Sequence, residues 1–270
     1  MSKVHSTAIV HPKAQLDADV EVGPYTIIDE NVVIGSGTKV AHHATVTGHT
    51  VLGKNNVVFP YAAIGTAPQD LTYRGEPTRL TIGDGNTFRE FVTVHCGTTK
   101  DKEETILGNN NLLMAYAHVG HDSIIGSNTI LSNGVQLGGH VWVEDYAVLG
   151  GLVGVHHFVT IGKHAFIGGI ARVIQDVPPF MIAEGHPAKV RAPNSIGLER
   201  RGFSEEKVEA IEKAFKLIWH SKKTVQQALK YLQEKYGQME EIIYLVKFLQ
   251  NMQNGKYGRY REVTRKIPAR

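Results

Sequence analysis

The sequence predicts a mainly β protein: a parallel β-helix built from six-residue repeats, followed by a small α-helical domain. Two observations lead to this prediction. A large apolar residue recurs at every sixth position over most of residues 10–173, whereas the chain after residue 204 shows helix-start signals and apolar stripes at helical spacing. We therefore place the β-helix at residues 1–190 and the helical domain, with a basic tail, at residues 191–270.

The six-residue repeat runs in two phases that differ by one residue. Glycine often follows the large apolar residue directly, and a small or branched residue stands four places after the large one. Neither the 3.6-residue period of a helix nor the two-residue period of a strand explains this pattern. Short strands that bend at a fixed place do explain it, because each hexad then forms one side of a triangular coil with its large residue inside. The large residues are Val10, Leu16, Val22, Ile28, Ile34, Val40, Val46, Leu52, Val58, Ile64, Ile82, Phe88 and Val94, then Leu107, Leu113, Val119, Ile125, Leu131, Leu137, Val143, Leu149, Val155, Ile161, Ile167 and Val173.

Two gaps interrupt the repeat, at about residues 69–80 and 99–106. We expect both to be loops that leave the coil. Long loops on a rigid scaffold often carry function, although a tolerated surface insertion explains such a gap equally well.

The chain after Val173 departs from the repeat. Prolines between residues 175 and 193 predict an irregular link. Three helices are then expected: one capped by Ser204, one that begins with a capping box of Thr224 and Gln227, and one near residues 240–252. Residues 256–270 are basic and without periodicity, so we expect them to be frayed.

Composition limits the class of protein. The chain has 270 residues, of which 42% are hydrophobic, and its net charge of +3 is too small to indicate nucleic-acid binding over the whole chain. Cys96 is the only cysteine, so no intramolecular disulfide forms. No apolar run reaches transmembrane length, and the start does not resemble a signal peptide. We expect a cytoplasmic protein with no nucleic-acid partner and no stable membrane insertion.

Histidine is unusually abundant, with 14 residues. Within the repeat, histidines avoid the inward first and fifth places of their hexads, which leaves exposed surface, a metal site or acid–base chemistry as interpretations. His118 and His121 lie two coils before His156 and His157, but a third zinc ligand with an orienting carboxylate is not evident. A histidine beside a carboxylate, such as His121 before Asp122, suits proton transfer near neutral pH. Adjacent residues on a straight strand point to opposite faces, so their contact requires the bend of the hexad to fall there.

Several segments resemble those of the UDP-N-acetylglucosamine O-acyltransferase family, which catalyses the first step of lipid A synthesis. The resemblance extends in order over essentially the whole chain, including both loops and the helical end. It implies a left-handed coil, which the general preference for right-handed crossovers would not predict. The segments are NLLMAYAHVGHD (111–122), PQDLTYRGEPTRLTIGD (68–84), LGGHV (137–141), GGLVGVHHF (150–158), QDVPPFMIAEG (175–185) and GLERRGFS (197–204).

This resemblance implies transfer of a 3-hydroxyacyl chain from acyl carrier protein to the 3-hydroxyl of the UDP-sugar. It implies no metal and no cofactor beyond the phosphopantetheine of the carrier. It makes His121 the general base, Asp122 the carboxylate that orients it, and the Gly139 N–H the donor to the oxyanion. It also implies a homotrimer with sites between neighbouring coils, and Gly169 as the residue that limits acyl length. The substrate-binding residues implied are Asp70, His95, His118, His140, His156 and His157, with Asn194, Arg200 and Arg201 at the nucleotide end.

Four positions depart from the family pattern. The family usually has lysine at Thr72, glutamine at His157 and asparagine at His186, and often glutamate at Ile196. The change at Thr72 leaves open a 2,3-diamino UDP-sugar as acceptor, which would be N-acylated. A zinc hydratase of the hexapeptide class is a further alternative.

Overall fold

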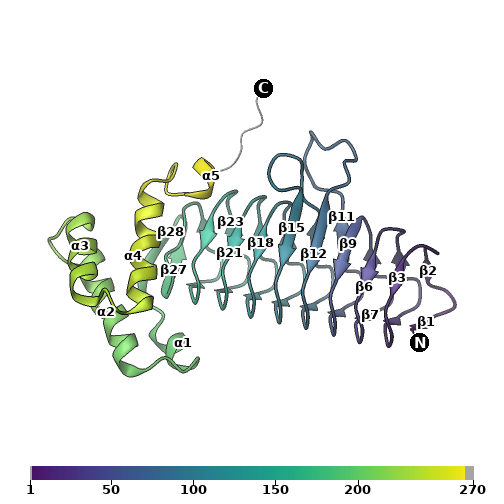
Figure 1. The fold of residues 1–270 in the computed structure, drawn as a ribbon, viewed down its shortest axis with the longest axis horizontal. Coiled ribbons are helices and arrows are strands. Elements are labelled where there is room, and N and C mark those ends of the chain that lie inside the picture. The colour runs from purple at the N-terminus through teal and green to yellow at the C-terminus, as the bar shows by residue number, and fades with distance from the viewer. Residues whose placement is uncertain (1, 265–270) are drawn as a thin grey trace.

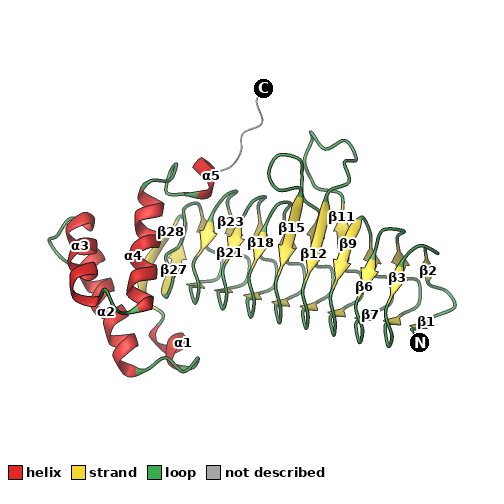
Figure 2. Ribbon diagram, in the orientation of Figure 1, coloured by secondary structure: helices red, strands yellow, loops and turns green. Residues whose placement is uncertain are grey.

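A computed structural model describes residues 2–264, and the end of the predicted basic tail, residues 265–270, lies outside the described residues. Most of the chain forms a long coil of short strands, and four of the five helices in residues 2–264 gather at one end of this coil (Figure 1). Figure 2 shows the same division by secondary structure, with strands along the coil and most of the helices beyond its last turns.

Three sheets form the three sides of the coil. The first sheet has 11 strands: β1 (Lys3–Val4), β4 (Glu21–Val22), β7 (Lys39–Val40), β10 (Val57–Val58), β13 (Thr87–Phe88), β16 (Leu112–Leu113), β19 (Ile130–Leu131), β22 (Val148–Leu149), β25 (Phe166–Ile167), β27 (Met181–Gly185) and β28 (Ala188–Pro193). The second has nine: β2 (Ile9–Val10), β5 (Ile27–Ile28), β8 (Thr45–Val46), β11 (Ala63–Thr66), β14 (Thr93–His95), β17 (His118–Val119), β20 (Gln136–Leu137), β23 (Gly154–Val155) and β26 (Arg172–Val173). The third has eight: β3 (Gln15–Leu16), β6 (Val33–Ile34), β9 (His49–Leu52), β12 (Arg79–Ile82), β15 (Glu104–Leu107), β18 (Ile124–Ile125), β21 (Trp142–Val143) and β24 (Thr160–Ile161).

The core confirms the predicted repeat. All the large residues named above are buried, except Val10 and Leu16, which are partly buried against the same core. Strands pair in parallel so that equivalent residues stack, as Val119 does between Val94 and Leu137. The structure thus places the inward positions where the six-residue period predicts them.

The bend of the hexad falls three residues after the large apolar one. At that place the backbone enters the left-handed region, with φ of 63° at Tyr61, 58° at Asp122 and 63° at His140. Each such corner redirects the chain from one sheet to the next, and it turns the side chains on either side of it toward the same edge of the coil.

Two loops leave the coil where the gaps predicted them. One joins β11 to β12 and the other joins β14 to β15, and both project from one edge in Figure 1. Lys100 of the second loop contacts Asp70 of the first, with 2.6 Å between Nζ and Oδ2, so the loops are tied to each other.

The helical end comprises α1 (Ser195–Glu199), α2 (Glu205–Trp219), α3 (Val225–Tyr236), α4 (Glu240–Gln253) and α5 (Arg261–Thr264). Ser204 caps α2, and Thr224 and Gln227 form the predicted capping box of α3. The buried faces of α2, α3 and α4 share one apolar cluster with Phe180 and Met181 of the preceding link. None of the helices in residues 2–264 is long and apolar enough to cross a membrane.

Two expectations about the link and tail were wrong. Residues 181–193 form an antiparallel hairpin, β27 and β28, because its prolines lie at the turn and at the end of an edge strand, where no ladder donor is required. Residues 256–264 are not frayed. The Arg259 guanidinium donates to the Ile174 carbonyl at 3.0 Å, and the Tyr260 N–H donates to Asp176 at 2.9 Å. These bonds hold the segment on the coil.

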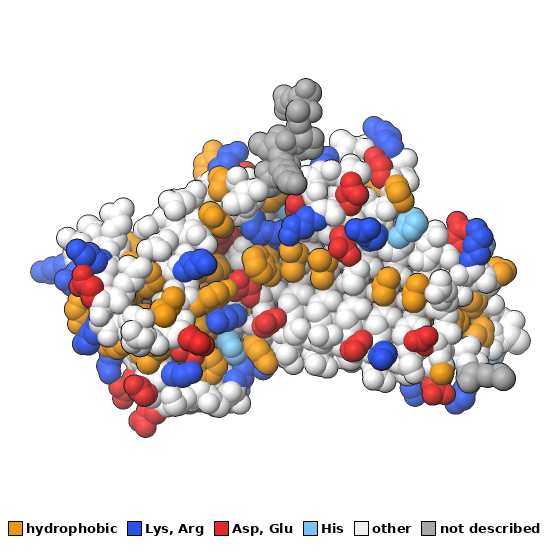
Figure 3. Space-filling model, in the orientation of Figure 1, with side chains coloured by type: hydrophobic (Ala, Val, Ile, Leu, Met, Phe, Trp, Pro, Cys, Tyr) orange, Lys and Arg blue, Asp and Glu red, His pale blue; other side chains and the backbone are white. Residues whose placement is uncertain are grey.

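The surface carries both signs of charge. On the face shown in Figure 3, lysine and arginine are interspersed with acidic side chains, and hydrophobic side chains form a row along the coil. In Figure 1 the third sheet faces the viewer, and its outward residues Val51 and Trp142 are 45% and 38% exposed. This face therefore lacks the continuous basic patch that nucleic-acid binding would require.

Candidate active site

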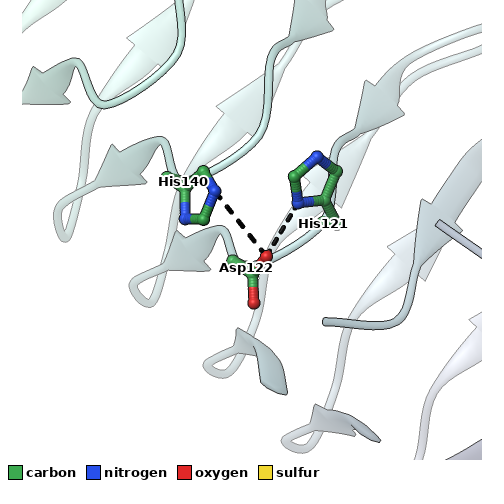
Figure 4. A group of neighbouring side chains, drawn as sticks. All are labelled: His121, Asp122 and His140. Carbon is green, nitrogen blue, oxygen red and sulfur yellow. Dashed lines mark hydrogen bonds and ion pairs between the residues drawn. The ribbon is translucent and has the colours of Figure 1, made fainter. Parts of the chain in front are cut away.

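His121 and Asp122 meet at the corner between the second and third sheets. The left-handed φ of Asp122 is the bend that their contact required, and His121 Nδ1 lies 2.7 Å from Asp122 Oδ2. Figure 4 shows the imidazoles of His121 and His140 on either side of this carboxylate. A carboxylate can only accept hydrogen bonds, so Nδ1 of His121 carries the proton and Nε2 keeps its lone pair when the ring is neutral.

The Asp122 carboxylate is firmly held. It is 2% exposed, and the Thr98 N–H donates to its Oδ1 at 2.8 Å while the Thr98 hydroxyl donates to its Oδ2 at 2.6 Å. The Asp122 N–H in turn donates to the Thr105 hydroxyl at 2.8 Å. Both threonines flank or belong to the second loop, so this loop fixes the group that orients His121.

Gly139 lies against the imidazole of His121. A Cβ at residue 139 would lie 2.5 Å from His121 Cε1 and 2.6 Å from Nε2, so only glycine leaves the ring in place. The neighbouring N–H groups are used in hydrogen bonds between coils: the Gly138 N–H donates to the Val155 carbonyl and the His140 N–H donates to the His121 carbonyl. No hydrogen bond joins the Gly139 N–H to another described residue. This donor is thus available beside the lone pair of His121.

A cleft of about 460 Å³ opens over His121, along the second sheet. It brings together most of the predicted histidines and the predicted glycine. It also contains three residues that the sequence analysis did not assign to the site. Gln69 lies in the quoted segment 68–84, whereas Gln136 and Arg172 lie in none of the quoted segments. Of the predicted site residues, the cleft is lined by His95, His118, His121, Gly139, His156 and His157.

The cleft histidines are partly desolvated. Burial, together with the neighbouring His95 and His121, lowers the pKa of His118 to about 4. Burial also lowers the pKa values of His95 and His157. His95 Nδ1 donates to the Ala67 carbonyl at 2.6 Å. Around neutral pH these three side chains therefore offer neutral imidazoles that can donate and accept hydrogen bonds.

His140 supports the pair and does not line the cleft. The resemblance placed it along the substrate groove, but it is only 5% exposed and its ring stacks on Phe158, with centroids 4.3 Å apart. Its Nδ1 lies 3.2 Å from Asp101 Oδ2, and its Nε2 lies 3.8 Å from Asp122 Oδ2. The geometry gives it a place behind His121, where it contacts the ring edge-on at 5.1 Å.

Comparisons with known proteins find relatives over most of the chain. Residues 176–257 match the second domain of the UDP-N-acetylglucosamine O-acyltransferase family, and residues 104–139 match the bacterial transferase hexapeptide repeat. The acyl-[acyl-carrier-protein]–UDP-N-acetylglucosamine O-acyltransferase of Thermodesulfovibrio yellowstonii is 45% identical over 94% of this chain and 99% of its own. The corresponding protein of a Janthinobacterium species is 53% identical over 86% and 89%. The solved UDP-N-acetylglucosamine acyltransferase of Bacteroides fragilis superposes with a TM-score of 0.89 at 39% identity, over 92% of this chain and 97% of its own.

The chain belongs to the UDP-N-acetylglucosamine O-acyltransferase family. It is an acyltransferase, and its coil is the left-handed parallel β-helix that the resemblance implied. The agreement covers both the coil and the helical end.

Several of the residues implied by the family resemblance lie away from the cleft. Asn194 donates its side-chain amide to the His164 carbonyl at 2.9 Å, and the Arg201 guanidinium lies over the Tyr146 ring at 4.6 Å. Tyr146 and His164 occupy corners between the third and first sheets, whereas His121 lies at a corner between the second and third. Arg200 ends α1 at the same remote side as Asn194 and is exposed. Gly169 lies at a corner between the first and second sheets. One chain alone does not gather these residues around His121.

Asp70 lies in the first loop, where it is bonded within the protein. Burial opposes ionisation, but hydrogen bonds from Lys100 and from the Thr72 N–H and hydroxyl hold the pKa of Asp70 well below its usual range. Thr72, which departs from the family lysine, is thus a hydrogen-bond donor to Asp70, while Lys100 brings the positive charge. Gln69, next to Asp70, is the loop residue that reaches the cleft.

His121, Asp122 and His140 together could also hold a metal ion, since one ligand atom of each lies within 4.8 Å of the others. Each already has a protein partner, however. Thr98 and His121 occupy the Asp122 oxygens, and Asp101 faces His140. Membership of an acyltransferase family argues against the zinc-hydratase alternative, and the absence of a functional metal stays a prediction.

Proposed function

We propose that this protein transfers a 3-hydroxyacyl chain from acyl carrier protein to the 3-hydroxyl of UDP-N-acetylglucosamine, the first step of lipid A biosynthesis, in the cytoplasm. The observation that supports it best is the His121–Asp122 pair at the cleft, with Nδ1 committed to the carboxylate. The relatives are named for this reaction. No cofactor takes part beyond the phosphopantetheine of the carrier.

In the proposed mechanism His121 Nε2 takes the proton of the sugar hydroxyl as its oxygen attacks the thioester carbonyl. Asp122 stabilises the imidazolium that forms. The Gly139 N–H donates to the oxyanion of the tetrahedral intermediate. When the intermediate collapses, the carbon–sulfur bond breaks and the thiolate takes the proton from His121, so the base is restored. His95, His118, His156 and His157 would bind the substrates by hydrogen bonds.

We further propose a homotrimer in which a neighbouring chain completes each site. Asn194, Arg200 and Arg201 suit a diphosphate and its nucleoside, yet in one chain they lie at another edge of the coil from His121. A second observation supports association. Tyr61, Phe91 and Tyr116 stack in an exposed row at the corners between the first and second sheets, with centroids about 5 Å apart.

Sedimentation analysis at micromolar concentration tests this proposal, with a mass of about three chains expected. Mixing His121→Ala chains with Arg201→Ala chains provides a sharper test, since some mixed sites would receive both native residues. Partial recovery of activity in the mixture is expected. Fully active monomers would overturn the proposal.

The acceptor is tested directly by offering UDP-N-acetylglucosamine and its 2,3-diamino analogue with a ladder of 3-hydroxyacyl carriers. We expect transfer to the hydroxyl. Exclusive N-acylation of the diamino sugar would instead identify the alternative acceptor that the change at Thr72 leaves open. In the same preparation, zinc below stoichiometric amounts and activity that survives a chelator are expected.

A further inference from the structure

We propose that Arg261 and Asp101 are positioning residues that hold His140 against the His121–Asp122 pair, so that the last described helix forms part of the active site. This inference rests on the proposed function. Arg261 lies in α5, more than a hundred residues along the chain from the groups that it orders.

Arg261 contacts both the backbone at His140 and the partner of the His140 side chain. Its Nη1 donates to the His140 carbonyl at 2.8 Å, and its Nη2 lies 3.8 Å from Asp101 Oδ2. Asp101 Oδ2 accepts from His140 Nδ1 at 3.2 Å. One guanidinium thus spans the coil and the second loop, which the single ammonium of lysine cannot do.

The fixed position of the His140 ring in turn limits how the His121 imidazole can move relative to Asp122. The His140 ring is confined between Phe158, on which it stacks at 10°, and the edge of His121, which it meets at 86°. Because Asp101 accepts from Nδ1, the ring plane and its tautomer are both set. The same loop carries Thr98, which donates to Asp122. Loosening Asp101 or His140 would therefore free His121 to turn away from Asp122.

The segment that presents Arg261 is anchored independently of it. Arg259 bonds to the Ile174 carbonyl and to Glu262, and Asp176 donates its N–H to Gly258 at 2.8 Å. Removing the Arg261 guanidinium should consequently leave the segment in place. The side chains of Arg261 and Asp101 are 14% and 15% exposed, so both are largely shielded from water, and thermal melts check that each variant is folded.

The test compares Arg261→Met, Arg261→Lys, Asp101→Asn and the double variant Arg261→Met/Asp101→Asn, with Val263→Ala as the matched control on an exposed residue of α5. We expect Arg261→Met and Asp101→Asn each to lower kcat about tenfold or more, with KM values for both substrates nearly unchanged. Arg261→Lys should recover part of the loss. The double variant should be no worse than the poorer single variant, because both changes release the same ring. Val263→Ala should match the parent.

A kcat of Arg261→Met equal to that of the parent would overturn the inference, and so would losses that multiply in the double variant or that appear in KM alone. A parent that transfers no acyl group would refute the proposed function instead. The two failures are separated by nitrogen-15 NMR of the histidines, which needs no turnover. We expect Arg261→Met and Asp101→Asn to shift the His140 Nδ1 resonance and Val263→Ala to leave it unchanged. An unshifted resonance in both variants would contradict the positioning role.

Discussion

Replacement of Gly139 by alanine probes the contact between the coil and the base. The new Cβ would lie 2.5 Å from His121 Cε1 and 2.6 Å from Nε2, whereas ordinary contacts begin at 3.4 Å. The imidazole must therefore move by about 0.9 Å, which is enough to break its 2.7 Å bond to Asp122. Misplacement of a reacting group by about 1 Å costs on the order of a hundredfold in rate. We expect kcat of Gly139→Ala to fall by about that factor.

The assay is kcat for acyl transfer in a double-mutant cycle with His121→Ala. Where His121 has already been removed, the clash is absent, so Gly139→Ala should have almost no further effect. Circular dichroism melts check that each variant is folded. The reasoning is refuted if Gly139→Ala keeps a third or more of the parent rate. It is also refuted if the change costs the same with and without the imidazole.

Two further predictions concern acyl length and pH. Gly169→Met should shift preference to acyl donors several carbons shorter. A Cβ at residue 169 meets only the Gly151 backbone, at 3.4 Å and 3.8 Å, so the added side chain can extend into the space of the terminal methylenes, each of which is worth about 0.8 kcal/mol when buried. An unchanged donor preference in a carrier-ladder assay would show that Gly169 does not limit acyl length. Burial raises the pKa of Asp176 to about 6, although hydrogen bonds from the Tyr260 and Thr160 N–H groups act in the opposite direction. The stability that the protonated side chain contributes to the fold is therefore complete below about pH 4 and is lost as pH rises through 6. The free energy of unfolding of Asp176→Asn, measured relative to that of the parent, should therefore increase by up to about 3 kcal/mol as pH rises from 4 to 7. A difference between the two proteins that does not change with pH in paired melts would contradict this.

The sequence predicted the coil because a six-residue period has few structural explanations. It also predicted the inward residues, because the same two places of each hexad point into the core in every coil. The hairpin at residues 181–193 was missed because the prolines there were counted as breakers, without regard to their places at a turn and a strand end. Proline disrupts a sheet only where its N–H is needed.

The site was predicted in part. His121 and Asp122 were identified, and the needed bend had a signal in the sequence: asparagine, which tolerates a left-handed backbone, stands three residues after the large apolar one at Asn55, Asn110 and Asn128. Thr98 and Asp101 lie in a loop without periodicity, and no pattern links Arg261 to His140. Such contacts depend on how separate segments fold back on the coil, which a local repeat does not encode.

The central claim is that His121 is the base that removes the proton of the acceptor hydroxyl. Its most direct test is the single-turnover rate of His121→Ala with acyl carrier and UDP-N-acetylglucosamine bound at saturating concentration. Because His121 is not an inward residue of the coil, the variant should fold, and loss of a general base costs on the order of a hundred- to ten-thousandfold. A folded variant slowed by that range is the predicted result. A variant that keeps more than about a tenth of the parent rate would contradict the assignment of His121 as the general base.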